Sequence, residues 1–154
     1  MKVLVPEQSP QASPPYRGAR RLSQTWCGAH PMIESKATIL LRIARRDLVA
    51  ASFLHEPHVS EASWGLLIHQ VLEKSLKAWL VTLGVPFPST DDLRILIDLL
   101  YQNDVDVREL NQFIVFNQFA AQCHHASDPD PLHLNRRFWE MRAEELVNHL
   151  STVP

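Results

Sequence analysis

The stretch from Ser63 to Leu80, SWGLLIHQVLEKSLKAWL, decides the fold. Apolar side chains recur in it at intervals of three and four residues, which is the spacing of one face of an α-helix. The predicted buried stripe consists of Trp64, Leu67/Ile68, Val71, Ser75, Ala78/Trp79 and Thr82. The same stretch carries a row of polar residues, His69-Gln70-x-x-Glu73-Lys74-x-x-Lys77. Two interpretations of this row are open, a solvated face with ion pairs or a functional motif.

Helical patterns also precede and follow this stretch. A first helix is predicted from Ile33 to about Leu54, where the proline of His55-Glu56-Pro57-His58 ends it. The second helix begins at Ser60 and Glu61, and two such helices joined by a short turn should pack antiparallel. A third helix is predicted to start at Ser89-Thr90-Asp91-Asp92, where Ser89 and Asp92 have the spacing of a capping box, and to end at Gln102-Asn103-Asp104. A fourth is predicted over residues 106–125, and a fifth with Asp130 as its N-cap and Pro131 at its first position.

The predicted core faces of these helices are apolar at helical spacing. They comprise Ile33, Ala37, Leu40, Ala44, Leu48 and Ala51 in the first helix; Leu93, Leu96, Ile97 and Leu100 in the third; Leu110, Phe113, Ile114, Asn117 and Ala121 in the fourth; and Leu134, Phe138, Met141, Leu146 and Leu150 in the fifth. Gly84 is a plausible C-cap of the second helix. No strand pattern competes, so we predict an all-α, up-and-down bundle of four to five helices.

Composition limits the class of protein. The chain has 154 residues, 45% of them hydrophobic, which favours one domain with a real core. Its formal net charge of −2 gives the chain no overall attraction to the negatively charged backbone of a nucleic acid. There is no membrane-length apolar run or signal-peptide segment, and Cys27 and Cys123 form no ligand-spaced set. A cytoplasmic protein with reduced thiols and no cofactor is expected.

Residues 1–31 differ in amino-acid composition from the rest of the chain. They hold five prolines, and four basic residues against one acidic residue, without a sustained period. Such a segment buries too little apolar surface to offset its ordering entropy, so we predict a flexible tail followed by one helical domain, residues 32–154. A transit peptide, or a true start at Met32, are the alternatives.

The first two predicted helices and the segment after them carry a family resemblance. ARRDLVAASFL (residues 44–54) and HQVLEKSLKAWLVTLGVPFPSTDDLRILIDLL (residues 69–100) resemble the HEPN domain, and the resemblance covers roughly residues 33–150. The matching residues are Asp47, Leu48, Ala51, Gln70, Glu73, Lys74, Lys77, Ala78, Gly84, Pro88, Thr90, Asp92 and Leu93. The resemblance implies a bundle of four to five helices that is usually a homodimer. It also implies a minimal nucleotidyltransferase partner, or RNase activity in toxin–antitoxin and defence systems.

The sequence departs from the family pattern in two places. Asp91 stands where the family usually has a histidine before Asp-Leu. RNase members carry Arg-x(4–6)-His near the start of the final helix, whereas this chain reads QCHHASDP over residues 122–129, without an arginine. Arg142 and His149 fit the spacing literally, but they lie near the end of the last helix, where a chance match is the better interpretation.

His124 and His125 are the candidate catalytic residues. A histidine can exchange protons with an RNA 2′-hydroxyl near neutral pH, but RNA cleavage also needs a cation for the phosphate charge. Arg136 and Arg137 could supply that cation if they fold back. The alternative is a histidine pair at the C-terminal end of a helix, where the negative end of the helix dipole stabilises positive charge.

The other candidates are arginines and the family motif. Arg42, Arg45 and Arg46 could bind phosphates, or could pair with acids such as Glu144 and Glu145. Asp47, Gln70, Glu73, Lys74 and Lys77 are predicted to build the fold more than to perform chemistry. A metal site is not expected, because the run from His124 to His133 matches no closed zinc spacing.

These observations favour a HEPN-like dimeric helical module, associated with a nucleotidyltransferase partner in a toxin–antitoxin or defence-type system and catalytically degenerate. An active metal-independent HEPN RNase is the first alternative. A helical protein-interaction adaptor without a connection to nucleic acid is the second.

Overall fold

The computed structural model of the protein describes residues 34–122 and 130–152. Over these residues the chain forms five α-helices and one 3-10 helix and has no β-strand, so the predicted all-α fold is confirmed. The described residues belong to one compact unit, Ile33–Pro154. The predicted flexible tail lies outside the described residues. No described helix is long and apolar enough to cross a membrane.

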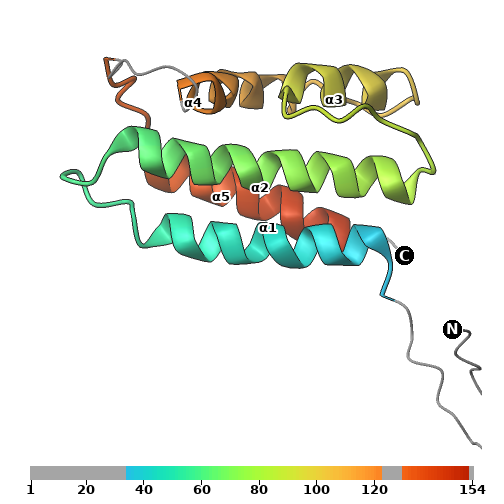
Figure 1. Ribbon diagram of the computed structural model, residues 1–154, viewed down its shortest axis with the longest axis horizontal. Coiled ribbons are helices and arrows are strands. Elements are labelled where there is room, and N and C mark those ends of the chain that lie inside the picture. The colour runs from blue at the N-terminus through green and yellow to red at the C-terminus, as the bar shows by residue number, and fades with distance from the viewer. Residues whose placement is uncertain (1–33, 123–129, 153–154) are drawn as a thin grey trace, which may run out of the picture. The chain divides into compact units, whose positions relative to one another are not determined.

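The longest helix, α2, lies at the centre of the bundle. In chain order the elements are α1 (Lys36–Ser52), α2 (Glu61–Thr82), α3 (Leu93–Tyr101), η1 (Asn111–Phe116), α4 (Asn117–Gln122) and α5 (Arg136–Thr152). α1 and α5 pack against α2 and against each other, while α3, η1 and α4 pack along another side of α2 (Figure 1). α1 and α2 run in opposite directions, as predicted.

Burial on several sides of α2 follows from this central place. The predicted stripe is largely confirmed, since Trp64, Ile68, Val71, Ser75 and Ala78 are buried. Thr82 is exposed, because it is the last residue of the helix. The opposite side is buried as well, through Leu72, Leu76 and Leu80. The α3 core residues Leu93, Leu96, Ile97 and Leu100 are also buried as predicted, but the helix begins at Leu93 with Asp92 as its N-cap, so the predicted start at Ser89 is wrong.

Local capping sets the ends of the first two helices. The Ser35 side chain accepts from the Thr38 amide at 3.1 Å, and Ser60 caps the start of α2. Gly84 ends α2 with a φ of 69°. The amide of Gly84 donates to Val81 O at 3.0 Å and that of Val85 to Leu80 O at 2.9 Å, which is a Schellman motif. The predicted C-cap role of Gly84 is therefore confirmed.

The predicted fourth helix begins later and is differently wound. The 3-10 helix η1 precedes the six-residue α4, and residues 123–125 lie outside the described part. A local turn occupies the expected first part, because the Asp106 carboxylate accepts from the Arg108 amide at 3.1 Å. In a 3-10 helix side chains three apart align, which places Phe113 and Phe116 together in the core. Ala121, predicted to be inward, is exposed.

The predicted start of the fifth helix is wrong by several residues. α5 begins at Arg136, and Asn135 Oδ1 caps it by accepting from the Phe138 amide at 3.1 Å. The preceding segment is kept out of a helix, because the Glu61 carboxylate accepts from the amides of Leu132 and Leu134 at 2.6 and 2.7 Å and His133 between them has a φ of 54°. Phe138 and Met141, predicted to be core residues, are 43% and 49% exposed. Leu146 and Leu150 are buried as predicted, and Ala143 and Val147 complete the inward face of α5.

Candidate functional site

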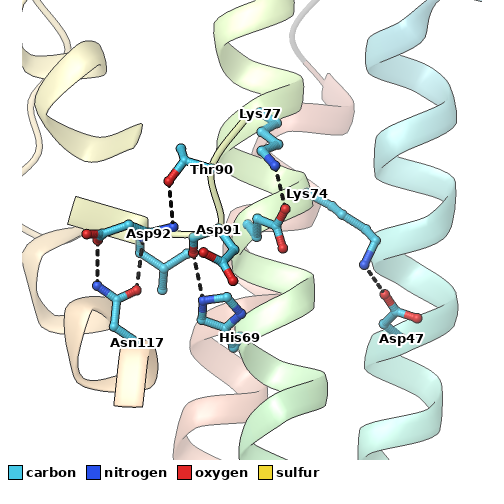
Figure 2. A network of polar contacts seen from close by, with 10 residues as sticks. Asp47, His69, Lys74, Lys77, Thr90, Asp91, Asp92 and Asn117 are labelled. Atoms are coloured by element: carbon cyan, nitrogen blue, oxygen red, sulfur yellow. Dashed lines mark hydrogen bonds and ion pairs between the residues drawn. The ribbon is translucent and has the colours of Figure 1, made fainter. Parts of the chain in front are cut away.

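The charged residues of the family motif pair with one another. Lys74 Nζ on α2 donates to Asp47 Oδ2 on α1 at 2.8 Å, and Lys77 Nζ donates to Glu73 Oε1 one turn away at 2.5 Å (Figure 2). The four side chains are only 17–21% exposed. Gln70, in the same row, is half-buried. The Lys74–Asp47 pair thus joins α2 to α1, whereas the Lys77–Glu73 pair lies within α2.

His69, the first residue of this row, is the most buried titratable side chain among the described residues. Its ring is 1% exposed, and Nε2 lies 2.9 Å from the carbonyl oxygen of Asp91. That carbonyl can only accept, so Nε2 carries the proton and Nδ1 is left without a hydrogen-bond partner. Burial lowers the pKa of His69, although the nearby Glu73 and the bond to Asp91 oppose this effect. The ring is thus neutral at pH 7.

A second polar cluster fastens the start of α3 to the start of α4. Asn117 Nδ2 donates to Asp92 Oδ1 at 2.7 Å, and Asn117 Oδ1 accepts from the Leu93 amide at 2.9 Å (Figure 2). Asp92 also caps α3 by accepting from the Arg94 amide at 2.9 Å. The Thr90 hydroxyl accepts from the Asp92 amide at 3.1 Å. These groups are saturated by backbone and side-chain bonds, so the cluster positions the segment around Asp91.

The arginines of the first helix line a groove. The groove has a volume of about 910 Å³ and lies between α1 and the C-terminal ends of α2 and α5; we call it the α1 groove. Arg42 Nη1 donates to both carboxylate oxygens of Glu34, at 2.6 and 2.8 Å, and Arg45 donates to Ser151 Oγ at 2.7 Å. Arg46 also lines it. The predicted alternative partners Glu144 and Glu145 are not bonded to these arginines in the described part of the chain.

Arg136 and Arg137, neighbours in sequence, lie in different surroundings. The Arg136 guanidinium donates to the carbonyl oxygens of Leu54, Glu56 and Val59 at 2.5, 2.9 and 2.7 Å. It also lies 5.7 Å from the Trp64 ring. Arg136 therefore holds the turn between α1 and α2, whereas Arg137 is exposed. Whether either acts on phosphate stays a prediction.

The remaining candidates are only partly within reach of the structure. His124 and His125 lie outside the described residues, so their predicted role stays a prediction. Arg142 pairs with Glu109 and Glu145 at 2.7 and 2.8 Å. The ring of His149 packs edge-on against Trp79 at 5.6 Å. Within residues 34–122 and 130–152, no group of three or more His, Cys, Asp or Glu side chains could hold a metal ion.

Two roles were not predicted from the sequence. His69 is the buried titratable residue of the site, and the sequence showed only that it opens the polar row, because its partner is the backbone carbonyl of Asp91, which any residue at that position would offer. Arg136 was considered only as a phosphate ligand. Its carbonyl partners lie 77 to 82 residues earlier in the chain, and no local pattern marks such a contact.

Comparison with known proteins identifies the family. The family model described as HEPN domain matches residues 37–149, which is most of the chain and runs from the first turn of α1 to the last turn of α5. The comparisons with curated proteins and with solved structures found no significant match. The match covers both the polar row on α2 and the segment around Asp91 that contacts it. The chain therefore belongs to the HEPN domain family.

Proposed function

We propose that this chain is a dimeric helical module that works by binding a partner protein, without catalysis by its family motif. The main support is that the charged residues of the family motif pair with one another. Lys74 pairs with Asp47 and Lys77 with Glu73, and all four side chains are largely buried. Side chains engaged in this way stabilise the bundle and present no reactive group to a substrate. The resemblance to HEPN proteins supports a nucleotidyltransferase-like partner in a toxin–antitoxin or defence-type system.

The surroundings of Arg136 favour this proposal over an active RNase. RNA cleavage by a histidine needs a cation that faces the phosphate. The guanidinium of Arg136 is already bonded to three backbone carbonyls, and moving it would leave these groups without their donor. Of the two arginines considered for that role, this leaves Arg137.

RNA cleavage is the sharpest test of the absence of catalysis. Purified wild-type protein is incubated with single-stranded RNA in the presence of a chelator, beside the His124→Ala/His125→Ala variant. We expect no cleavage by either protein. Cleavage by the wild type that disappears in the variant would refute the proposal and support the RNase alternative. Cleavage that survives in the variant would refute both the proposal and the histidine assignment.

Association is tested separately. Light scattering at micromolar concentration should give the mass of a dimer. If the gene lies beside a nucleotidyltransferase-like reading frame, that product should co-purify with the tagged chain after co-expression. A monomer that retains no such partner would contradict the proposed module.

A further inference from the structure

We propose that the α1 groove is a docking site for an acidic amphipathic helix of a partner protein, an inference that rests on the proposed partner-binding function and names the surface and the chemistry of the partner. Three observations carry it: the charge of the groove, its apolar floor, and its length along α1.

The charge of the groove is positive. Arg42, Arg45 and Arg46 line it, and Glu34 is the acidic residue among the described residues that line it. Arg46 has no ion pair or hydrogen bond to another described side chain. The Arg42–Glu34 pair is 49% and 35% exposed, and a pair of that kind contributes at most about 1 kcal/mol, so an incoming carboxylate can exchange with Glu34. Arginine also binds carboxylates in the bidentate geometry that a glutamate offers.

The floor of the groove is apolar. Leu41, Val49, Val81 and Leu150 line it, from three different helices. Val49 is 58% exposed. Aliphatic side chains at helical spacing on a partner would cover this surface, while acidic residues beside them would reach the arginines.

The lining makes nucleic acid the weaker candidate. Bases bind proteins largely by stacking on aromatic side chains, and no aromatic residue is among the described residues that line the groove. Arginine is instead enriched at surfaces that bind proteins.

The groove is long enough for a helix. Its lining follows α1 from Ser35 to Val49, which at about 1.5 Å per residue is about 20 Å. This length corresponds to roughly four helical turns.

The tail of this chain does not have the complementary charge. Residues 1–31 contain Lys2, Arg17, Arg20 and Arg21 against Glu7. A basic segment beside three arginines would be repelled, which favours an acidic segment from another protein.

The test uses the full chain and a synthetic peptide. The probe is a fluorescein-labelled 18-residue helix with leucines at positions i, i+3, i+4 and i+7 and glutamates flanking them. A matched probe carries lysine in place of each glutamate. Fluorescence anisotropy should show that the acidic peptide binds the wild type at least about tenfold more tightly than the basic peptide, a difference of about 1.4 kcal/mol.

Variants of the protein assign the binding to the groove. Arg46→Glu and, independently, Val49→Asp should each weaken binding of the acidic peptide at least about tenfold, because one reverses the charge and the other places an acid on the apolar surface. Arg94→Glu is the matched control, since Arg94 is exposed on α3 and outside the groove. Circular dichroism checks that the variants remain helical.

Several results would overturn the assignment. Equal affinity for the two peptides would do so, as would unchanged binding by both groove variants. Binding of a single-stranded RNA that depends on Arg46, in place of peptide binding, would show a nucleic-acid surface. A change from dimer to monomer in Arg46→Glu would show that a second copy occupies the groove. If the wild type fails to bind the peptide yet retains a co-purified partner, the groove assignment falls while the proposed function stands.

Discussion

His69 lies inside the bundle with one ring nitrogen bonded and the other without a partner. Its surroundings favour the neutral ring, because burial penalises the imidazolium more than Glu73 and the Asp91 carbonyl stabilise it. A group whose pKa is lowered by folding binds its proton more readily in the unfolded chain. The contribution of the neutral His69 ring to the stability of the folded protein is therefore fully present above the ordinary pKa of 6.5. It is lost as the pH falls from 6.5 toward the lower pKa that His69 has in the folded protein.

The pH dependence of stability follows from that sign. Between pH 7.5 and 5.5 the free energy of unfolding should decrease, with a slope of up to about 1.4 kcal/mol per pH unit for one proton taken up. Urea denaturation measures this, and His69→Gln should flatten the slope because an amide does not titrate in this range. His58→Gln, at an exposed position in the loop before α2, is the control. An unchanged slope in His69→Gln would show that another group is responsible.

Gly65 allows α2 to approach α4 closely. A Cβ atom at this position would lie 2.5 Å from the ring of Phe119, which real side chains do not tolerate. Gly65→Ala should therefore destabilise the protein by about 1–3 kcal/mol, although alanine is the better helix former by about 1 kcal/mol.

A second substitution separates these two effects. In a Phe119→Leu background the cost of Gly65→Ala should shrink by at least about 0.5 kcal/mol in thermal or urea unfolding. A stabilising effect of Gly65→Ala in the wild type would show that the ring moves away without cost.

At the scale of elements, the Asp47–Lys74 pair joins α1 to α2. A double-mutant cycle with Asp47→Asn and Lys74→Met, followed by urea unfolding, should give a coupling energy of about 0.5–1 kcal/mol, since both side chains are about 20% exposed. The more exposed Arg42–Glu34 pair should show a smaller coupling. No measurable coupling between Asp47 and Lys74 would mean that the motif does not stabilise the packing of the two helices.

The turn between α1 and α2 depends on α5 through Arg136. Arg136→Ala should lower the free energy of unfolding by about 2–3 kcal/mol, because the backbone carbonyls of the turn lose the charged donor to which they are bonded. Hydrogen exchange should accelerate at the amides of residues 55–60. Arg137→Ala, the adjacent and exposed arginine, should change stability by less than about 0.5 kcal/mol. Similar effects of the two changes would contradict the assigned role of Arg136.

At the scale of the whole domain, the core is organised around α2. Leu72 is 0% exposed, and Leu72→Ala should cost about 2–5 kcal/mol with an unchanged urea m-value. Leu83, at the end of the same helix, is 44% exposed, and Leu83→Ala should cost less than about 0.5 kcal/mol. A loss of similar size at the two positions would mean that a surface contact, such as one with a partner or a second copy, covers Leu83.

Patterns that repeat within one or two helical turns were readable from the sequence. The buried stripe of α2, the core residues of α3, the Ser60 cap and the Gly84 C-cap all depend on residues within a few positions of one another. The family membership was readable for the same reason, because the motif on α2 is contiguous.

Only the tertiary structure decided the features that depend on distant partners. Glu61 holds the segment around Leu132 and Leu134, 71 and 73 residues later, and so delays the start of α5 to Arg136. Phe138 and Met141 are exposed because the packing of α5 turns another face inward, the one that carries Ala143, Leu146, Val147 and Leu150. His69 acquires its lowered pKa from burial and not from its neighbours in sequence. Local periodicity specifies which residues are apolar, but hydrogen bonds between segments far apart in the chain decide where helices begin and which polar groups are enclosed.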